Sequence, residues 1–453
     1  MFHPPKPATL KSRPSPIRRF VRNLRSSISA FTDHSYQMKM GEVRGLSVRT
    51  YFLVQPDLVR KLLTASPSTY PKSDFLERIL NQMVGQGVFV SAGDTWARRR
   101  KMVDSAFGAA NITKMFPHML AAAQDLANEA PTGVTRIDTL TTRVAADIIF
   151  RTLFSEALKK DESKLLFDSF ESFQASAYAH GTWCLAGLPQ RVSPYRIKAQ
   201  RPAHILRDAL ARRVDARLEA RKKGQPPQDD LLDALMAARD DQGVGFTRDE
   251  LVDEVAVMFL AGHETSASAL AWAFYLIANS PGIQQRLHAE IDEAMGQGTL
   301  ETHHFRKLPL VRNVFRETLR LYPPVAFVPR KTTQAESWRD KRLKPGVTIF
   351  VSLWLLQRHR QIWKDSDGFD PDRFTTPEGK KASREAYLPF SIGPRVCIGA
   401  SFAMQEAAIV MAVVLQKFRF TPTDHVPIPV SKLTVRSENG IELNITPRSK
   451  RND

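Results

Sequence analysis

The sequence predicts a mainly α-helical protein with small β-sheets (an α+β fold), in which one large domain holds most of the chain. Two observations support this prediction. A helical pattern runs unbroken from Thr247 to Ser280, and at about 1.5 Å per residue it spans roughly 45 Å, enough to cross a domain. Neither an internal repeat nor a linker of boundary-like composition divides the chain. We therefore expect residues 31–453 to form a single domain, preceded by a basic, poorly ordered arm at residues 1–30.

The charge balance limits the classes of partner. The 453 residues include 65 Lys and Arg against 47 Asp and Glu, a net charge of +18, which attracts acidic proteins, anionic membrane surfaces or nucleic acid. Nucleic acid is the weakest candidate, because the basic residues are scattered and no zinc-finger spacing or RNA-binding aromatic motif occurs. No stretch approaches the ~20 apolar residues that span a bilayer, so we expect no transmembrane anchor.

Cysteine content and the N-terminal segment bear on location. Only Cys184 and Cys397 occur, too few for the disulfide framework of a secreted protein, so we expect a cytoplasmic location. The basic N-terminal segment lacks the apolar run of a signal peptide, although an organelle transit peptide stays open.

The first hundred residues contain one predicted sheet and two predicted helices. Glycines between β-prone runs indicate a small sheet over residues 36–54. Helical patterns follow over residues 55–65 and 95–107, and the connection between them at residues 66–93 is rich in loop signals.

The long helix has clear start and stop signals. Thr247 and Glu250 form a capping box, and Phe246 with Leu251 can make the hydrophobic staple around it. At its end Ser280 is a good N-cap for the next helix, which begins with a proline. Further helices are predicted at residues 310–322 and 400–418, and strands at residues 346–353 and within 433–445.

Cys397 lies on a loop immediately before the helix predicted at residues 400–418. A thiolate there gains from the positive end of the helix dipole and from the amides that follow. Gly393 and Gly399 allow tight turns and the close approach of a flat cofactor. Taken alone, a single cysteine is more often buried and inert.

The residues around Cys397 form a recognisable motif. The run Phe390-x-x-Gly393-x-Arg395-x-Cys397-x-Gly399 resembles the heme-binding signature of the cytochrome P-450 monooxygenases. The resemblance extends over nearly the whole chain and implies a single heme-thiolate domain of the P-450 type. In that domain heme b would lie between the long helix and the Cys loop, with Cys397 as the iron ligand and Phe390 and Gly399 beside it.

A second marker is Glu317-x-x-Arg320, whose acid and base lie on one helical face and can pair. Such a pair is common on solvated helices. Followed by the Cys motif, it resembles the family's buried network, with Arg373 as the third member. Its implied role is structural, because it would fix the loop that delivers the thiolate, and losing one partner would cost roughly 3–5 kcal/mol.

The middle of the long helix carries Ala261-Gly262-His263-Glu264-Thr265. Glycine and threonine both weaken a helix interior, which makes this run unusual. The plain alternative is that Thr265 bonds the carbonyl four residues back and that Gly262 allows close packing. The resemblance instead implies that Ala261 and Gly262 leave room above the iron, while Thr265 and Glu264 deliver protons as catalytic residues.

Four further residues match the family's heme-propionate contacts: Trp96 and Arg100, one helical turn apart, together with Arg330 and Arg395. They would neutralise two carboxylates in a partly buried site. The neighbouring Arg98 and Arg99 are expected to be solvated. On the substrate side, apolar segments resemble those that overhang the heme, and their candidate contacts are Val88, Phe89, Val325 and Phe327, although each is equally well explained as core.

The resemblance implies a monooxygenase that uses dioxygen and two externally supplied electrons to hydroxylate an apolar substrate, more in character a long-chain lipid or terpenoid than a small ring. No flavin or nicotinamide motif occurs, so a separate electron donor is expected, namely a ferredoxin or flavodoxin with its reductase. The protein itself is expected to be a monomer. Two rivals are a hydrogen-peroxide-using peroxygenase on the same fold, against which Glu264 and Thr265 argue, and a non-catalytic heme-binding sensor.

Overall fold

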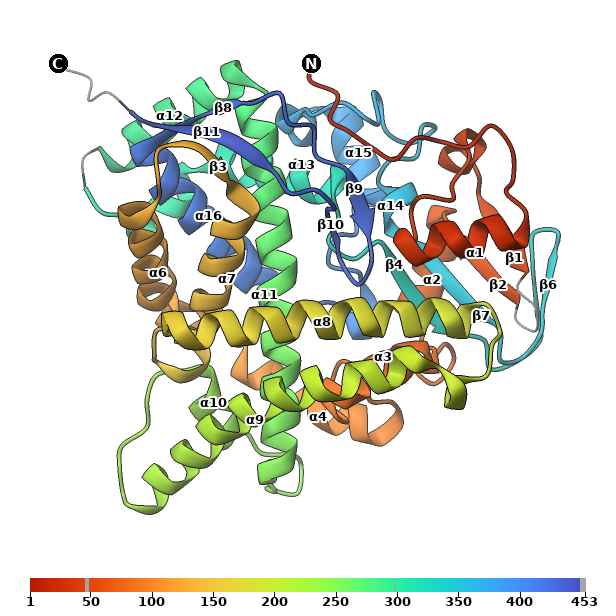
Figure 1. Cartoon of the computed structure of the whole chain (residues 1–453), viewed down its shortest axis with the longest axis horizontal. Coiled ribbons are helices and arrows are strands. Elements are labelled where there is room, and N and C mark those ends of the chain that lie inside the picture. The colour runs from red at the N-terminus through yellow and green to blue at the C-terminus, as the bar shows by residue number, and fades with distance from the viewer. Residues whose placement is uncertain (45–48, 297, 449–453) are drawn as a thin grey trace.

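The long helix α11 (Arg248–Ala278) runs through the middle of the molecule (Figure 1). The computed structural model describes residues 1–44, 49–296 and 298–448. The predicted start of α11 is confirmed, because the Thr247 hydroxyl accepts from the Glu250 amide and the Glu250 carboxylate accepts from the Thr247 amide. Most of α11 is buried on all sides, which explains why its sequence is apolar all round rather than striped.

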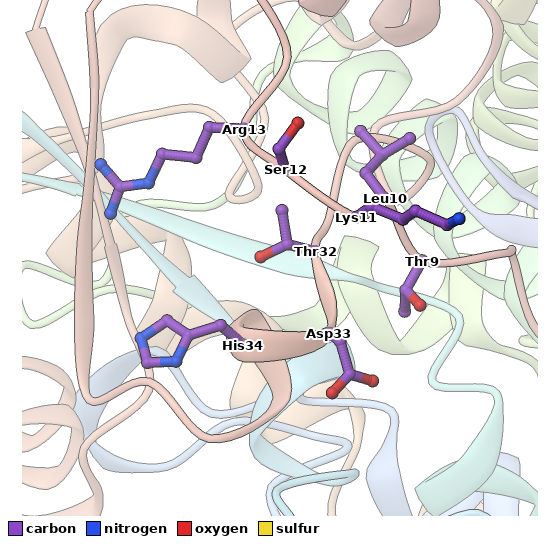
Figure 2. A pocket seen from close by; sticks show the side chains of 8 residues that line it. All are labelled: Thr9, Leu10, Lys11, Ser12, Arg13, Thr32, Asp33 and His34. Carbon is purple, nitrogen blue, oxygen red and sulfur yellow. The ribbon is translucent and has the colours of Figure 1, made fainter.

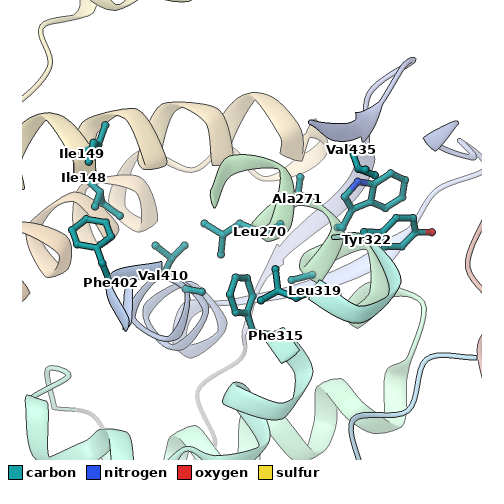
Figure 3. Packing of buried hydrophobic residues seen from close by; sticks show 14 of the residues in the cluster. Ile148, Ile149, Leu270, Ala271, Phe315, Leu319, Tyr322, Phe402, Val410 and Val435 are labelled. Carbon is teal, nitrogen blue, oxygen red and sulfur yellow. The ribbon is translucent and has the colours of Figure 1, made fainter. Parts of the chain in front are cut away.

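The core forms where α11 meets three other helices (Figure 3). Ile148 of α7 (Ile137–Phe154), Leu270 of α11, Phe315 of α13 (Pro309–Leu321) and Val410 of α16 (Ala400–Lys417) are all fully or nearly fully buried there. The helices predicted at residues 310–322 and 400–418 are thus confirmed and provide two walls of this core.

The remaining helices surround this centre. The helices predicted at residues 55–65 and 95–107 are confirmed as α2 and α4. The other bounds are α1 (Pro16–Arg25), α2 (Pro56–Thr64), α3 (Asp74–Val84), α4 (Gly93–Ala106), α5 (Ala109–Lys114), α6 (Phe116–Glu129), α8 (Lys160–Leu185), α9 (Pro194–Lys222), α10 (Leu231–Ala237), α12 (Pro281–Met295), α14 (Leu353–Leu356) and α15 (Pro377–Ala386).

Small sheets accompany the helices, as predicted. The largest has the order β1-β2-β7-β4, with β2 and β7 parallel and the other pairs antiparallel, and a three-stranded sheet has the order β3-β11-β8. Two further antiparallel pairs in the described ranges are β9-β10 and β5-β6. The strands are β1 (Met40–Arg44), β2 (Arg49–Leu53), β3 (Gly133–Arg136), β4 (Phe327–Lys331), β5 (Glu336–Trp338), β6 (Lys341–Leu343), β7 (Thr348–Ser352), β8 (Phe418–Pro422), β9 (Pro429–Ser431), β10 (Val435–Ser437) and β11 (Glu442–Pro447).

The connection at residues 66–93 contains a helix that the loop signals concealed. Ser73 caps α3 by accepting from the Phe75 amide, and Ile79, Leu80 and Met83 are buried along one face. Pro71 and Gly85 flank this helix, and their turn-forming character outweighs the apolar spacing in the local sequence pattern.

The N-terminal segment was expected to be a poorly ordered arm, but the structure places it against the body. Phe2 forms a β-bridge with Phe369, Lys6 pairs with Asp367, and the Leu10 amide donates to the Phe31 carbonyl at 3.0 Å. Residues 9–13 and 32–34 line an open pocket of about 350 Å³ (Figure 2). The basic composition therefore meets acidic groups from distant parts of the chain, which the local sequence does not reveal.

None of the helices in the described ranges combines the length and the apolar character needed to cross a bilayer.

Candidate functional site

A backbone hydrogen bond closes the loop that carries Cys397. The Cys397 amide donates to the Phe390 carbonyl at 2.9 Å, and Gly393 has a φ of 78°. A Cβ on Gly393 would lie 2.2 Å from the Leu63 carbonyl oxygen, so only glycine fits where the loop crosses α2. At Gly399 a Cβ would meet nothing within 4 Å, which leaves open space beside the loop.

Cys397 is exposed in this structure. The pKa of the Cys397 thiol is raised above its ordinary value, mainly because the protein packed around the thiol desolvates it. The Gly399 amide and the Arg100 guanidinium oppose this shift. Arg100 also donates to the Val396 carbonyl at 2.8 Å and so ties α4 to the loop.

Glu317, Arg320 and Arg373 are brought together as predicted. Glu317 and Arg320 are completely buried, and Arg320 donates to both carboxylate oxygens of Glu317 at 2.8 Å. Arg373 donates to Oε1 of Glu317 at 3.2 Å, and the Asp370 amide to the same oxygen at 3.1 Å. Two guanidiniums thus share one carboxylate in the core.

This network is connected to the Cys loop through Gln357. Arg320 donates to the Gln357 carbonyl at 2.8 Å. The Gln357 side chain in turn accepts from the Leu388 amide at 2.9 Å and donates to the Leu319 carbonyl. The backbone that enters the loop is therefore held by the buried charges, which supports their predicted structural role.

The predicted basic residues also converge. The Arg395 guanidinium lies 4.2 Å above the Trp96 ring and donates to the Ser91 carbonyl. Arg330 is buried, and within the described residues its guanidinium donates to the neighbouring Pro329 carbonyl alone. Burial lowers the pKa of Arg330 to about 10, and burial together with nearby positive charge lowers that of Arg395 to about 10.

Lys72 joins this group, although nothing in its local sequence marked it. Its ammonium lies 4.3 Å above the Phe89 ring and donates to the Phe89 carbonyl. Burial, and then the three neighbouring arginines, lower its pKa well below the usual value. Over the described ranges, no carboxylate pairs with Lys72, Arg330 or Arg395. Because buried positive charge is costly without a partner, this cluster indicates a binding site for an anionic ligand.

The middle of α11 is open on one side. Ala261 is exposed, although the residues of α11 before Leu260 and after Thr265 are mostly buried. A Cβ on Gly262 would lie 3.0 Å from Cδ1 of Ile149 on α7, a contact that favours the packing role of this glycine over a role in making room.

Thr265 and Glu264 have different surroundings. The Thr265 hydroxyl donates to the Ala261 carbonyl at 2.6 Å, which is the bond that the plain alternative expects. Glu264 accepts from Gln174 of α8 at 2.8 Å and from the Thr434 hydroxyl at 2.6 Å. It also lines a polar pocket of about 170 Å³, so its carboxylate is close to solvent.

The four candidate substrate contacts do not share one environment. Val88 is buried and Phe89 is half-buried beneath Lys72. Val325 is partly exposed, whereas Phe327 packs in a cluster of aromatic rings that includes Phe52 and supports the core explanation.

The expectation that Arg98 and Arg99 are solvated is wrong. Arg99 is 5% exposed and donates to Glu254 at 3.1 Å, while Arg98 donates to Glu250 at 2.8 Å. Both arginines point from α4 toward carboxylates of α11, which local sequence could not show because the two segments are about 150 residues apart.

Comparison with known proteins now identifies this arrangement. The family model described as Cytochrome P450 matches residues 21–445. The chain belongs to the cytochrome P450 family. The P450 fold is confirmed by the crystal structure of the cytochrome P450DA heme domain, which superposes with a TM-score of 0.79 at 22% identity and covers 91% of this chain and 90% of that one.

Curated P450 relatives have similar coverage. Cytochrome P450 4F12 of Homo sapiens is 29% identical over 433 residues, covering 87% of this chain and 80% of the relative. Cyclooctatin synthase of Streptomyces melanosporofaciens is 31% identical over 402 residues, covering 86% and 83%. Cytokinin hydroxylase of Arabidopsis thaliana is 29% identical over 406 residues, covering 87% and 78%.

As a P450, the protein is a heme-dependent monooxygenase that hydroxylates an apolar substrate with electrons from a redox partner. The residues present fit heme. Its two propionates match the buried, unpaired cations, and Arg395 Nε and the Ser91 hydroxyl are buried polar atoms without a partner in the described structure. The exposed Cys397 and Ala261 and the open space at Gly399 fit a flat group between loop and helix.

Proposed function

We propose that heme b binds between α11 and the Cys loop, with the Cys397 thiolate as the axial iron ligand and Phe390 and Gly399 beside it. The observation that carries this proposal is the buried group of cations next to the loop. Lys72, Arg330 and Arg395 have no carboxylate partner within the described part of the chain. An anionic cofactor would remove the cost of burying their charge.

The propionates would be held from three directions. Trp96 and Arg100 come from α4, Arg330 from β4 and Arg395 from the Cys loop, and Lys72 adds a fifth contact. The Arg395 guanidinium is already oriented by its stacking on Trp96. Because the cations raise each other's energy, binding two carboxylates would relieve their mutual repulsion.

When bound, heme supplies an iron whose thiolate ligand favours cleavage of the dioxygen O–O bond. The chain's own contribution is to hold the thiolate and to move protons. The Thr265 hydroxyl lies on the same face of α11 as the exposed Ala261, one turn away, and can pass on a proton. Glu264, in contact with the polar pocket, can exchange protons with solvent and resupply Thr265.

The substrate class that we propose is a long-chain lipid or a terpenoid-like molecule. The names of two relatives, leukotriene-B4 omega-hydroxylase 3 of Mus musculus and cyclooctatin synthase, support this class. Val88, Phe89 and Val325 are the proposed apolar contacts, whereas Phe327, the fourth candidate, packs among aromatic rings and belongs to the core.

For the electron donor we propose a small acidic ferredoxin or flavodoxin with its reductase. The net charge of +18 supports attraction to an acidic protein. We propose that the enzyme acts as a monomer in the cytoplasm, where its two free cysteines would stay reduced.

The thiolate assignment is tested by Cys397→Ala. The reduced carbon monoxide complex of the parent should show the thiolate-type spectrum, and the variant should lose it while keeping its fold by circular dichroism. Cys184→Ala is the matched control and should leave the spectrum unchanged. A thiolate-type spectrum in Cys397→Ala would overturn the assignment.

A product assay tests the reaction. Turnover of a fatty acid that requires NAD(P)H, a surrogate ferredoxin system and dioxygen supports the monooxygenase. Turnover with hydrogen peroxide alone would favour the peroxygenase, and binding without any product would favour the sensor.

A further inference from the structure

Residues 85–91, here called the strap, connect α3 to α4 and lie directly on α11. Gly85 has a φ of 53°, and a Cβ there would lie 1.9 Å from Oδ1 of Asp253. A Cβ on Gly87 would lie 2.5 Å from the Val257 side chain. The two glycines let the strap backbone approach the long helix more closely than any other residue would allow.

Two carboxylates of α11 bind the strap backbone at its near end. The Gln86 amide donates to Asp253 at 3.0 Å, and the Val88 amide donates to both oxygens of Glu254 at 3.1 Å. Glu254 is completely buried and Asp253 nearly so. Amide bonds to buried carboxylates are among the stronger hydrogen bonds in proteins.

Arginines from two other helices neutralise these carboxylates. Arg99 of α4 donates to Glu254 at 3.1 Å and to Asp253 at 3.4 Å. Arg207 of α9 donates to Asp253 at 2.9 Å and to the Met83 carbonyl at the end of α3, also at 2.9 Å. Four helices therefore meet at the point where the strap begins.

The far end of the strap is held by the proposed propionate cations. Lys72 donates to the Phe89 carbonyl and Arg395 to the Ser91 carbonyl. The strap thus runs from an acidic anchor on α11 to the basic cluster of the heme site, and it carries Val88 and Phe89 between these two ends.

We infer that Asp253 and Glu254 are positioning residues that hold the strap, and with it Val88 and Phe89, in a fixed place beside the basic cluster, and thereby set how the proposed heme site discriminates between short and long apolar ligands. This inference rests on the proposed heme site. If the anchor is lost, the strap amides lose their acceptors, the strap moves more freely, and long ligands are penalised less than in the parent protein.

The test uses the heme-loaded full chain in four forms: parent, Glu254→Leu, Glu254→Gln and Asp249→Asn. Asp249 lies on the same helix with an exposed side chain, and its variant is the matched control. Glutamine keeps one acceptor oxygen and should rescue part of the effect. If Glu254→Leu does not retain heme, Glu254→Gln carries the test against the control.

Hydrogen exchange gives the first measurement. The Val88 amide should exchange about tenfold faster in Glu254→Leu and less so in Glu254→Gln, as expected for the loss of one charge-assisted bond. The Asp249→Asn control should match the parent. An unchanged rate at Val88 in both Glu254 variants would overturn the anchoring.

Binding of imidazole, butylimidazole and octylimidazole, followed by the heme spectrum, gives the second measurement. These ligands bind heme iron whatever the natural substrate is. The ratio of octylimidazole to imidazole affinity should rise by several-fold in Glu254→Leu and return toward the parent value in Glu254→Gln, and a fall in this ratio would overturn the inference. A uniform change in all three affinities would indicate a merely structural role and overturn the inference, whereas a parent without a heme spectrum would instead refute the proposed function.

Discussion

Removing the charge of Glu317 should destabilise the protein strongly. In Glu317→Gln the shape of the side chain is kept, but Arg320 and Arg373 are left in the core without their shared carboxylate. Four hydrogen bonds now end on the two carboxylate oxygens, and the Glu317 and Arg320 side chains are 0% exposed. Breaking a buried pair in this way costs about 3–5 kcal/mol.

That cost corresponds to a rise of about 10²-fold to 4 × 10³-fold in the unfolded population, since every 1.4 kcal/mol or so is a factor of ten. A urea titration of the heme-loaded protein, with pulse proteolysis as the readout, measures this change in the free energy of unfolding. Because Gln357 connects the network to Leu388, the variant should also lose heme faster than the parent.

The matched control is Asp372→Asn, in the same segment of chain as Arg373. Asp372 pairs with Arg286 at 2.8 Å, but both side chains are about half exposed, and such surface pairs contribute about 1 kcal/mol or less. If Glu317→Gln costs no more than Asp372→Asn, the reasoning that the buried triad holds the Cys loop is refuted.

Four further predictions follow from the same structure. Thr265→Ala should keep the thiolate-type spectrum but release more peroxide per NAD(P)H consumed, and an unaltered product yield per electron would contradict the proton-delivery role. Burial raises the pKa of Glu406 to about 8 from an ordinary value of 4.5. Its contribution to the free energy of unfolding is therefore fully present below about pH 4.5 and is lost as the pH rises through about 8. Urea titrations at several pH values should show this dependence in the parent, and Glu406→Gln should make the free energy of unfolding less dependent on pH. Gly393→Ala should prevent heme incorporation during expression, since its Cβ would lie 2.2 Å from the Leu63 carbonyl oxygen at a φ of 78°, and normal heme content would contradict the steric argument. Lys72→Met should speed heme transfer to apomyoglobin severalfold, and an unchanged rate would remove Lys72 from the propionate contacts.

Local chemistry allowed much of the fold to be predicted from sequence. The start of α11 depends on the reciprocal bonds of Thr247 and Glu250, which lie three residues apart, and the structure shows both bonds. The face shared by Glu317 and Arg320 follows equally from helical spacing. The motif around Cys397 resembles the family's heme-binding signature through residue types and spacing alone.

The tertiary structure alone decided which charges are buried and with what partners. Arg99 and Lys72 look like ordinary solvated cations in sequence, yet one binds Glu254, about 150 residues away, and the other lies among arginines. The N-terminal segment looked like a free basic arm because its acidic partner, Asp367, is about 360 residues distant. The sequence by itself therefore determined the capped start of α11, the pairing of Glu317 with Arg320 and the cysteine motif, because these depend on neighbours within a few residues. Charge burial instead depends on which distant groups the fold brings within a few ångströms.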